Sequence, residues 1–109
     1  MTTYYYVLAS QSFLTEKEPL EEVLRERVRN YHENEKEIDF WLIKQPAFLE
    51  APEMAAVKQE CPTPAAAIIS TNPQFITWSK LRLEFVKTGE FQAPSDTIPE
   101  PLASLATVA

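Results

Sequence analysis

The apolar positions of the chain follow strand-like and helix-like repeats in turn, and these repeats predict the order of the elements. An unbroken β-favouring run over residues 3–9, which includes three consecutive tyrosines, predicts a strand buried on both faces. The apolar run over 37–44 predicts a second, central strand. Small and β-branched residues over 65–70 predict a third strand, against which a helix can pack closely.

Two helices are predicted between these strands. The first runs to about Asn34, because apolar residues recur there every three or four positions. Thr15 and Glu18 have the spacing of a capping box, which places its start near Thr15. The second helix is expected over residues 50–61, with Pro52 tolerated in its first turn.

A third helix follows the last predicted strand. Asn72 and Pro73 form a typical helix start, with Asn as the cap and Pro at the first helical position. The helix is expected to run to about Thr88 and to end at Gly89, the one glycine of the chain, in a left-handed conformation. Phe91 is expected to pack back on the body.

The elements therefore follow the order β-α-β-α-β-α and predict a small α/β domain over residues 1–92. The pattern alone leaves parallel and antiparallel pairing open. Beyond this domain, proline, alanine, serine and threonine dominate and no aromatic residue occurs. Residues 93–109 are accordingly predicted to form a flexible tail.

Composition excludes several classes of function. One glycine among 109 residues excludes the glycine-rich loops that cradle phosphates. His32 and Cys61 are the only histidine and cysteine, too few for a zinc site, and a disulfide within the chain is impossible. The net charge of −6 disfavours a nucleic-acid partner, because phosphate binding needs clustered Lys and Arg. No cofactor or metal is expected.

The first residues contain no basic stretch and are rich in strand-forming residues, so no signal peptide is expected. No apolar run approaches the roughly 20 residues that span a bilayer. The composition therefore favours a soluble protein of a reducing intracellular compartment.

Two charged residues interrupt apolar patterns and are the candidate functional residues. On a helical wheel of the third helix, Arg82 lies near the centre of the apolar arc that also holds Trp78. Asp39 interrupts the second strand, beside Phe40. An unpaired buried guanidinium is costly, so Arg82 is expected either in an ion pair or on an exposed apolar surface.

Three interpretations of these residues stay open at this stage. Asp39 and Arg82 form one structural ion pair, or both lie at a partner-binding surface with Phe40 and Trp78. The third interpretation, acid–base catalysis by Asp39 and Arg82, has little support, because no nucleophile paired with a base is visible. His32 is interpreted as a favourable residue at a helix end, and Cys61 as a quiet half-buried thiol.

Several stretches of the chain resemble the "hypothetical chloroplast frame fifty-four" family of cyanobacteria and plastids. These stretches are TTYYYVLAS at 2–10, IDFWL at 38–42, QPAFL at 45–49, STNPQFITW at 70–78 and LRLE at 81–84. The resemblance covers about residues 2–92 and leaves out the predicted tail. It implies a small, largely antiparallel sheet of three or four strands flanked by helices.

The resemblance also implies a function in chlorophyll synthesis. Members are accessory subunits of the aerobic magnesium-protoporphyrin IX monomethyl ester cyclase, the membrane-bound di-iron enzyme that forms the fifth ring. The family's partner-contact positions correspond to Asp39, Phe40 and Arg82. By this resemblance the chain is not an enzyme, and its partners are the cyclase catalytic subunit and other chlorophyll-synthesis enzymes. Its expected location is the cyanobacterial cytoplasm or plastid stroma, at the membrane surface through its partner.

A second hypothesis is a carrier that delivers the porphyrin substrate. Trp41, Trp78 and the tyrosines could stack on a tetrapyrrole, and Arg82 could pair with a propionate. The sequence does not separate delivery of the substrate from support of the enzyme.

Overall fold

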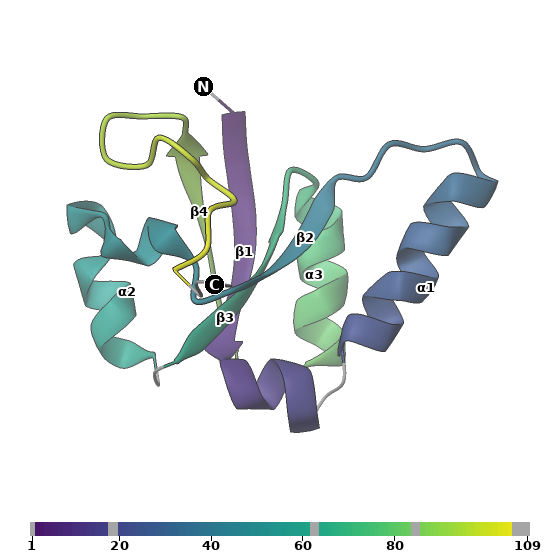
Figure 1. Ribbon diagram of the computed structural model, residues 1–109, viewed down its shortest axis with the longest axis horizontal. Helices are drawn as coiled ribbons and strands as arrows, with labels where there is room; N and C mark the ends of the chain where they lie inside the picture. The colour runs from purple at the N-terminus through teal and green to yellow at the C-terminus, as the bar shows by residue number, and fades with distance from the viewer. Residues whose placement is uncertain (1, 18–19, 62–63, 84–85, 106–109) are drawn as a thin grey trace.

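Four antiparallel strands form one sheet in the order β2-β3-β1-β4, as the computed structural model shows (Figure 1). The structure describes residues 2–17, 20–61, 64–83 and 86–105. The strands are β1 (Thr2–Ser10), β2 (Phe40–Lys44), β3 (Ala65–Ser70) and β4 (Lys87–Ala93). The α+β fold with an antiparallel sheet, which the resemblance implied, is thus confirmed.

Helices cover both faces of this sheet. In Figure 1, α1 (Leu20–Glu33) and α3 (Pro73–Arg82) lie on one side, and the short α2 (Ala55–Glu60) lies on the other with the C-terminal segment. Alternate residues of β1 follow this division. Val7 packs in the cluster beneath α1 and α3, whereas Tyr6 and Leu8 pack in the opposite cluster.

The two central strands match their predictions closely. β3 begins and ends where the sequence places it, and each of its six residues is buried. β1 extends the predicted run by one residue at each end. Both strands have a neighbour on either side and a cluster on each face, which explains their continuous apolar composition.

The prediction of a central strand over 37–44 is wrong in position and in extent. The strand begins only at Phe40, and β2 lies at an edge of the sheet. Glu35 has a positive φ of 55°, and the chain from Lys36 to Asp39 is irregular. β2 is apolar despite its edge position because Phe40 and Leu42 belong to one cluster and Ile43 to the other.

The first two helices also differ from their predictions. A helical turn begins directly after β1, before a π-helical turn over Phe13–Lys17, so Thr15 is not a cap. Instead, the hydroxyl of Ser10 accepts from Phe13 N at 3.2 Å, and Thr15 donates to the carbonyl of Gln11. Glu18 lies outside the described residues. The segment predicted as one helix over 50–61 holds two short pieces, a 3₁₀ turn over Pro52–Met54 and then α2, and another 3₁₀ turn over Ala47–Glu50 precedes them.

α3 begins as predicted but ends early. Asn72 Oδ1 accepts from Gln74 N at 2.9 Å, which confirms the cap, and Pro73 is the first helical residue. The helix ends at Arg82 rather than near Thr88, and the chain returns as β4. Gly89 is therefore a strand residue opposite Tyr6 and has no positive φ. Pairing with β1 overrides the local helical pattern.

Gly89 leaves room for the ring of Tyr6, and this predicts the effect of Gly89→Ala. A Cβ at this position would lie 2.6 Å from Tyr6 Cζ and closer still to the hydroxyl oxygen. Tyr6 is buried and cannot swing away freely. The overpacking cost of about 1–3 kcal/mol should exceed the gain of about 0.4–1 kcal/mol from stiffening the unfolded chain.

Urea unfolding measures the loss. Removal of the hydroxyl in the double variant Gly89→Ala/Tyr6→Phe should restore part of the free energy of unfolding. Equal or higher stability of Gly89→Ala alone would show that the strand accommodates the methyl group.

The C-terminal segment returns to the body of the molecule. Ile98 is buried with Phe91 in the cluster on the α2 face, and Phe91 packs back as predicted. Ala47 N donates to Ala103 O at 2.9 Å, and Leu105 N donates to Gln45 O at 2.7 Å. The described part of the predicted tail, through residue 105, thus contacts the domain, while its flexibility stays a prediction. Residues 106–109 lie outside the described residues.

Candidate functional site

The four predicted site residues come from two segments, the start of the edge strand β2 and the helix α3 that packs on the sheet. Asp39 directly precedes β2 and Phe40 begins it, while Trp78 and Arg82 lie one turn apart on α3. Phe40 and Trp78 both belong to the apolar cluster beneath α1 and α3. The structure therefore brings the two segments into one neighbourhood, although they are far apart in sequence.

A continuous row of aromatic rings joins these segments. Tyr31 of α1 meets the ring of Phe40 edge-on, with centroids 5.1 Å apart. Phe40 stacks on Phe75 at 4.5 Å, and Phe75 contacts Trp78 at 5.5 Å. Phe40 is only 3% exposed, so most of its ring is packed within this row.

Asp39 is held in place by hydrogen bonds. The hydroxyl of Tyr31 donates to Asp39 Oδ1 at 3.1 Å. The backbone carbonyl of Asp39 accepts from Ser70 Oγ at 2.8 Å and from Thr71 N at 3.1 Å. Ser70 is completely buried and also accepts from Asn72 N, so it ties the start of β2 to the start of α3.

Arg82 lies on the surface, and its predicted position within an apolar arc is wrong. The arc assumed a helix to Thr88, but α3 ends at Arg82 itself. The buried side of α3 consists of Phe75, Ile76 and Ser79, while Leu81 is 80% exposed. Within the described residues no ion pair joins Asp39 to Arg82, so the geometry gives no support to a structural pair.

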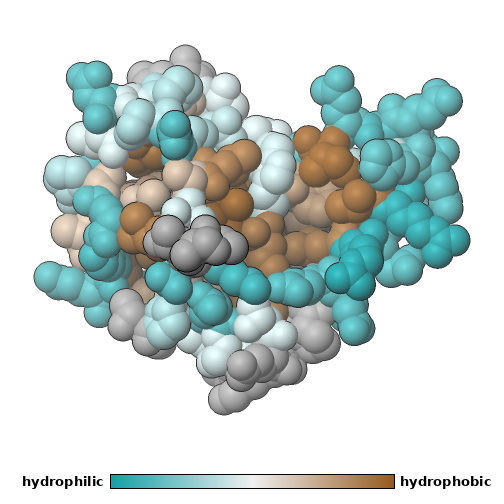
Figure 2. Space-filling model, viewed as in Figure 1, coloured by the Kyte–Doolittle hydropathy of each residue, from teal (hydrophilic) through white to brown (hydrophobic). Residues whose placement is uncertain are grey.

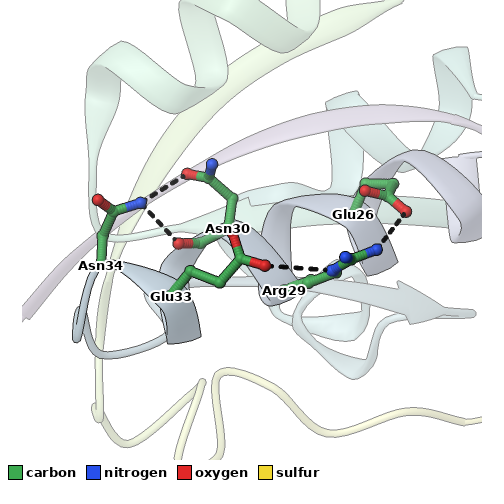
Figure 3. A network of polar contacts seen from close by, with 5 residues as sticks. All are labelled: Glu26, Arg29, Asn30, Glu33 and Asn34. Carbon is green, nitrogen blue, oxygen red and sulfur yellow. Dashed lines mark hydrogen bonds and ion pairs between the residues drawn. The ribbon is translucent and has the colours of Figure 1, made fainter.

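Trp78 and Arg82 line an open groove of about 590 Å³ between α1 and α3, here named the α1–α3 groove. Its other lining residues come from α1: Val23, Glu26, Arg27, Arg29, Asn30 and Glu33. Figure 3 shows how the α1 side is organised. Arg29 lies 3.3 Å from Glu33 and 4.0 Å from Glu26, and Asn34 donates to the carbonyl of Asn30 (Figure 3).

Sequence reasoning missed Arg27, which is central to this groove. Its guanidinium carbon lies 4.3 Å from the centroid of Trp78 and 5.7 Å from that of Phe75, in cation–π geometry. Val23, Arg27 and Tyr31 are spaced by four residues and share one side of α1. An arginine in an apolar stripe, the signal that marked Arg82, was therefore present in α1 too.

A second open groove, of about 550 Å³, lies between α1 and the edge strand β2. Its lining residues are Glu21, Leu24, Arg25, Val28, Phe40, Trp41, Leu42, Ile43, Lys44 and Ser104. Figure 2 shows apolar side chains gathered in this hollow beside the hydrophilic outer side of α1. Lys44 and Glu21, 3.1 Å apart, form an ion pair across it.

The hydrogen bond between Tyr31 and Asp39 predicts a pH dependence of stability. Burial, and then the bond to the Asp39 carboxylate and its charge, raises the pKa of Tyr31 above its ordinary value of 10.0. The folded state therefore holds this proton more tightly than the unfolded state. The resulting stabilisation is fully present below pH 10.0 and is lost as the pH rises through the folded-state pKa.

In Tyr31→Phe, the free energy of unfolding should therefore fall less steeply as the pH rises through the alkaline range. Tyr6→Phe is the matched comparison, because it removes a phenol on the opposite face of the sheet. The pKa of Tyr6 is raised by burial alone, without a carboxylate partner. Urea unfolding across the alkaline range measures both. An alkaline slope in Tyr31→Phe identical to that of the wild-type protein would contradict the account.

The two other residues considered for catalysis, His32 and Cys61, line neither of these two grooves. His32 lies exposed in the last turn of α1, as predicted. Burial raises the pKa of the Cys61 thiol, which lowers its thiolate fraction at neutral pH. No three His, Cys, Asp or Glu side chains of the described residues gather as metal ligands. Nor is any helix in the described residues long and apolar enough to cross a membrane.

Comparison with known proteins adds the family context. The family model described as "Ycf54 protein" matches residues 2–93, which include all four predicted site residues. A "Ycf54-like protein" of Synechocystis sp. is 66% identical over 105 residues, covering 96% of this chain and 79% of that protein. "Protein YCF54, chloroplastic" of Arabidopsis thaliana is 40% identical over 104 residues, covering 94% of this chain and 47% of that protein.

Solved structures share the whole fold. The Ycf54 protein from Synechocystis sp. PCC6803 superposes with a TM-score of 0.93 at 65% identity, covering 96% of this chain and 98% of that one. A protein from Nostoc sp. PCC 7120 reaches 0.94 at 75% identity, covering 96% and 97% of the two chains.

Proposed function

Because the chain belongs to the Ycf54 family, we propose that it is a non-catalytic accessory subunit in chlorophyll synthesis. Its partner is the membrane-bound di-iron magnesium-protoporphyrin IX monomethyl ester cyclase, which it binds and supports during formation of the fifth ring. Relatives from a cyanobacterium and a chloroplast fit an organism or organelle that makes chlorophyll.

One observation carries the proposal: Trp78 and Arg82 line one open groove beside an exposed Leu81. Arginine and tryptophan are enriched among the residues that dominate binding energy at protein interfaces. Arg82 has no ion pair within the described residues, so its charge is available to a partner. The ring of Trp78 continues into the aromatic row of Phe75, Phe40 and Tyr31, and Asp39 accepts from Tyr31 at the other end of that row.

The arrangement of Asp39 fits support rather than catalysis. Its carboxylate accepts from Tyr31, and its backbone carbonyl binds the end of β3 and the residue that follows. These bonds tie the residue before β2 to α1 and to the end of β3. Asp39 is therefore assigned a positioning function at the proposed interface, and Arg82 a contact function.

A porphyrin carrier is the second candidate, and the positions of the aromatic residues favour it less. Trp41 lines the groove between α1 and β2, whereas Trp78 lines the α1–α3 groove. Tyr4 and Tyr6 are engaged with Phe91 on the α2 face. The rings that would have to stack on one tetrapyrrole are thus divided among two separate grooves and the α2 face of the sheet.

Affinity capture separates the two candidates. The tagged protein is recovered from detergent-solubilised chlorophyll-making cells, and the eluate is analysed for proteins and for pigment. The proposal predicts recovery of the di-iron cyclase without stoichiometric porphyrin. Bound porphyrin without the cyclase would overturn it in favour of the carrier. The protein is expected at the membrane surface only in cells that contain the cyclase.

A further inference from the structure

The side chain of Arg27 is incompletely satisfied within the α1–α3 groove. Its guanidinium stacks against Trp78, and its Nε is shielded from solvent without a hydrogen-bond partner among the described residues. A buried charged donor that lacks an acceptor is unfavourable, whereas a carboxylate that reaches it forms a strong, charge-assisted bond. The groove thus holds a donor that an incoming acceptor would satisfy.

The charges around the groove favour a negative group. Arg29 is occupied by Glu26 and Glu33 along the outer side of α1 (Figure 3). Arg27 and Arg82 remain, and neither forms an ion pair within the described residues. The chain as a whole carries a net charge of −6, so a groove with two available arginines contrasts with the rest of the molecule.

Apolar surface adjoins these arginines. Trp78 forms part of the groove wall, and Leu81, three residues further along α3, is 80% exposed. An aromatic wall, two guanidinium groups and an adjacent apolar side chain match a short peptide segment in which an acidic residue stands beside an apolar one.

We infer that the α1–α3 groove receives an acidic segment of the partner protein, whose Asp or Glu carboxylate binds Arg27 and Arg82 together. The apolar neighbour of that carboxylate rests on Leu81. This inference rests on the proposed function and adds the chemistry of the contact. Arg27 becomes a second contact residue. Trp78 supports one face of its guanidinium, so that the N–H groups at the edge can bind a carboxylate.

Labelled peptides that together cover the cyclase catalytic subunit test the inference. At least one peptide should bind the wild-type protein, and replacement of its Asp and Glu by Asn and Gln should weaken binding more than about tenfold. Arg27→Gln and Arg82→Gln should each weaken it similarly. The matched control is Arg25→Gln, which changes the same residue type on the same helix but in the groove beside β2. It should bind like wild type.

Capture of the intact cyclase, run in parallel, separates the two levels of the account. If the wild-type protein captures the cyclase but no peptide binds in a carboxylate-dependent way, the inference fails and the proposed function stands. Normal binding by folded Arg27→Gln has the same meaning. If the wild-type protein captures no cyclase, the proposed function fails and the inference falls with it.

Discussion

Phe40→Ala should lower the free energy of unfolding by about 3–5 kcal/mol, the largest effect on stability expected at the predicted site. The ring is 3% exposed, is stacked on Phe75 and is met edge-on by Tyr31. Its removal leaves a cavity between β2, α1 and α3. Because a domain of this size has a total stability of about 5–15 kcal/mol, much of the protein would unfold under mild conditions.

This prediction changes how a binding defect at Phe40 is interpreted. Urea unfolding and cyclase capture should be measured on the same samples, with Phe40→Leu as the control that fills much of the cavity. Both stability and capture should recover largely in Phe40→Leu. A loss of less than about 1 kcal/mol in Phe40→Ala would contradict the packing account and restore Phe40 as a direct contact.

Arg82→Ala should have the opposite profile, with a large effect on binding and a small effect on stability. Arg82 is exposed at the end of α3, so truncation removes at most a favourable charge near the helix C-terminus, worth about 0.3–1 kcal/mol. Cyclase capture should weaken at least about tenfold, the effect typical of an interface anchor.

Lys80→Ala is the matched control, because it removes the same charge from the same turn of α3 on a side away from the α1–α3 groove. It should share the small change in stability and leave capture intact. Unfolding of Arg82→Ala would make Arg82 structural and remove the interface interpretation. Equal losses of capture in both variants would mean that the partner senses only the net charge of the helix end.

Sequence reasoning located the elements whose signals are local and strong. β1 and β3 are unbroken runs of strand-forming residues. Asn72 caps α3 by a local hydrogen bond, and the ring of Pro73 fixes a helical backbone angle, so neither signal depends on tertiary contacts. The sequence pattern does not distinguish parallel from antiparallel pairing. The family resemblance implies antiparallel pairing, and the register of β1 with β3 confirms it.

The errors concern segments decided by distant contacts. The first residues of β4, up to Gly89, were predicted as the end of a helix, because the strand pairing of Gly89 with Tyr6 cannot be predicted from the local sequence. β2 was predicted to be central, because an edge strand with both faces covered has the same apolar composition as a central one.

At the site, a search for charged residues that interrupt an apolar pattern identified Arg82 but missed Arg27. Arg82 drew attention as a charge in an apolar arc, although the arc itself was drawn over a helix that ends sooner. Arg27 breaks the apolar stripe of α1 in the same way. Its contact with Trp78 depends on how α1 and α3 face one another, which no periodicity within one helix can predict.

Equilibrium binding of the purified protein to the purified, pigment-free di-iron cyclase in detergent tests the central claim most directly. The account predicts saturable binding with a Kd of about 1 µM or tighter, and binding that weakens as salt screens Arg27 and Arg82. No binding to the pigment-free enzyme, or binding that requires porphyrin, would contradict the account and return the protein to the carrier hypothesis.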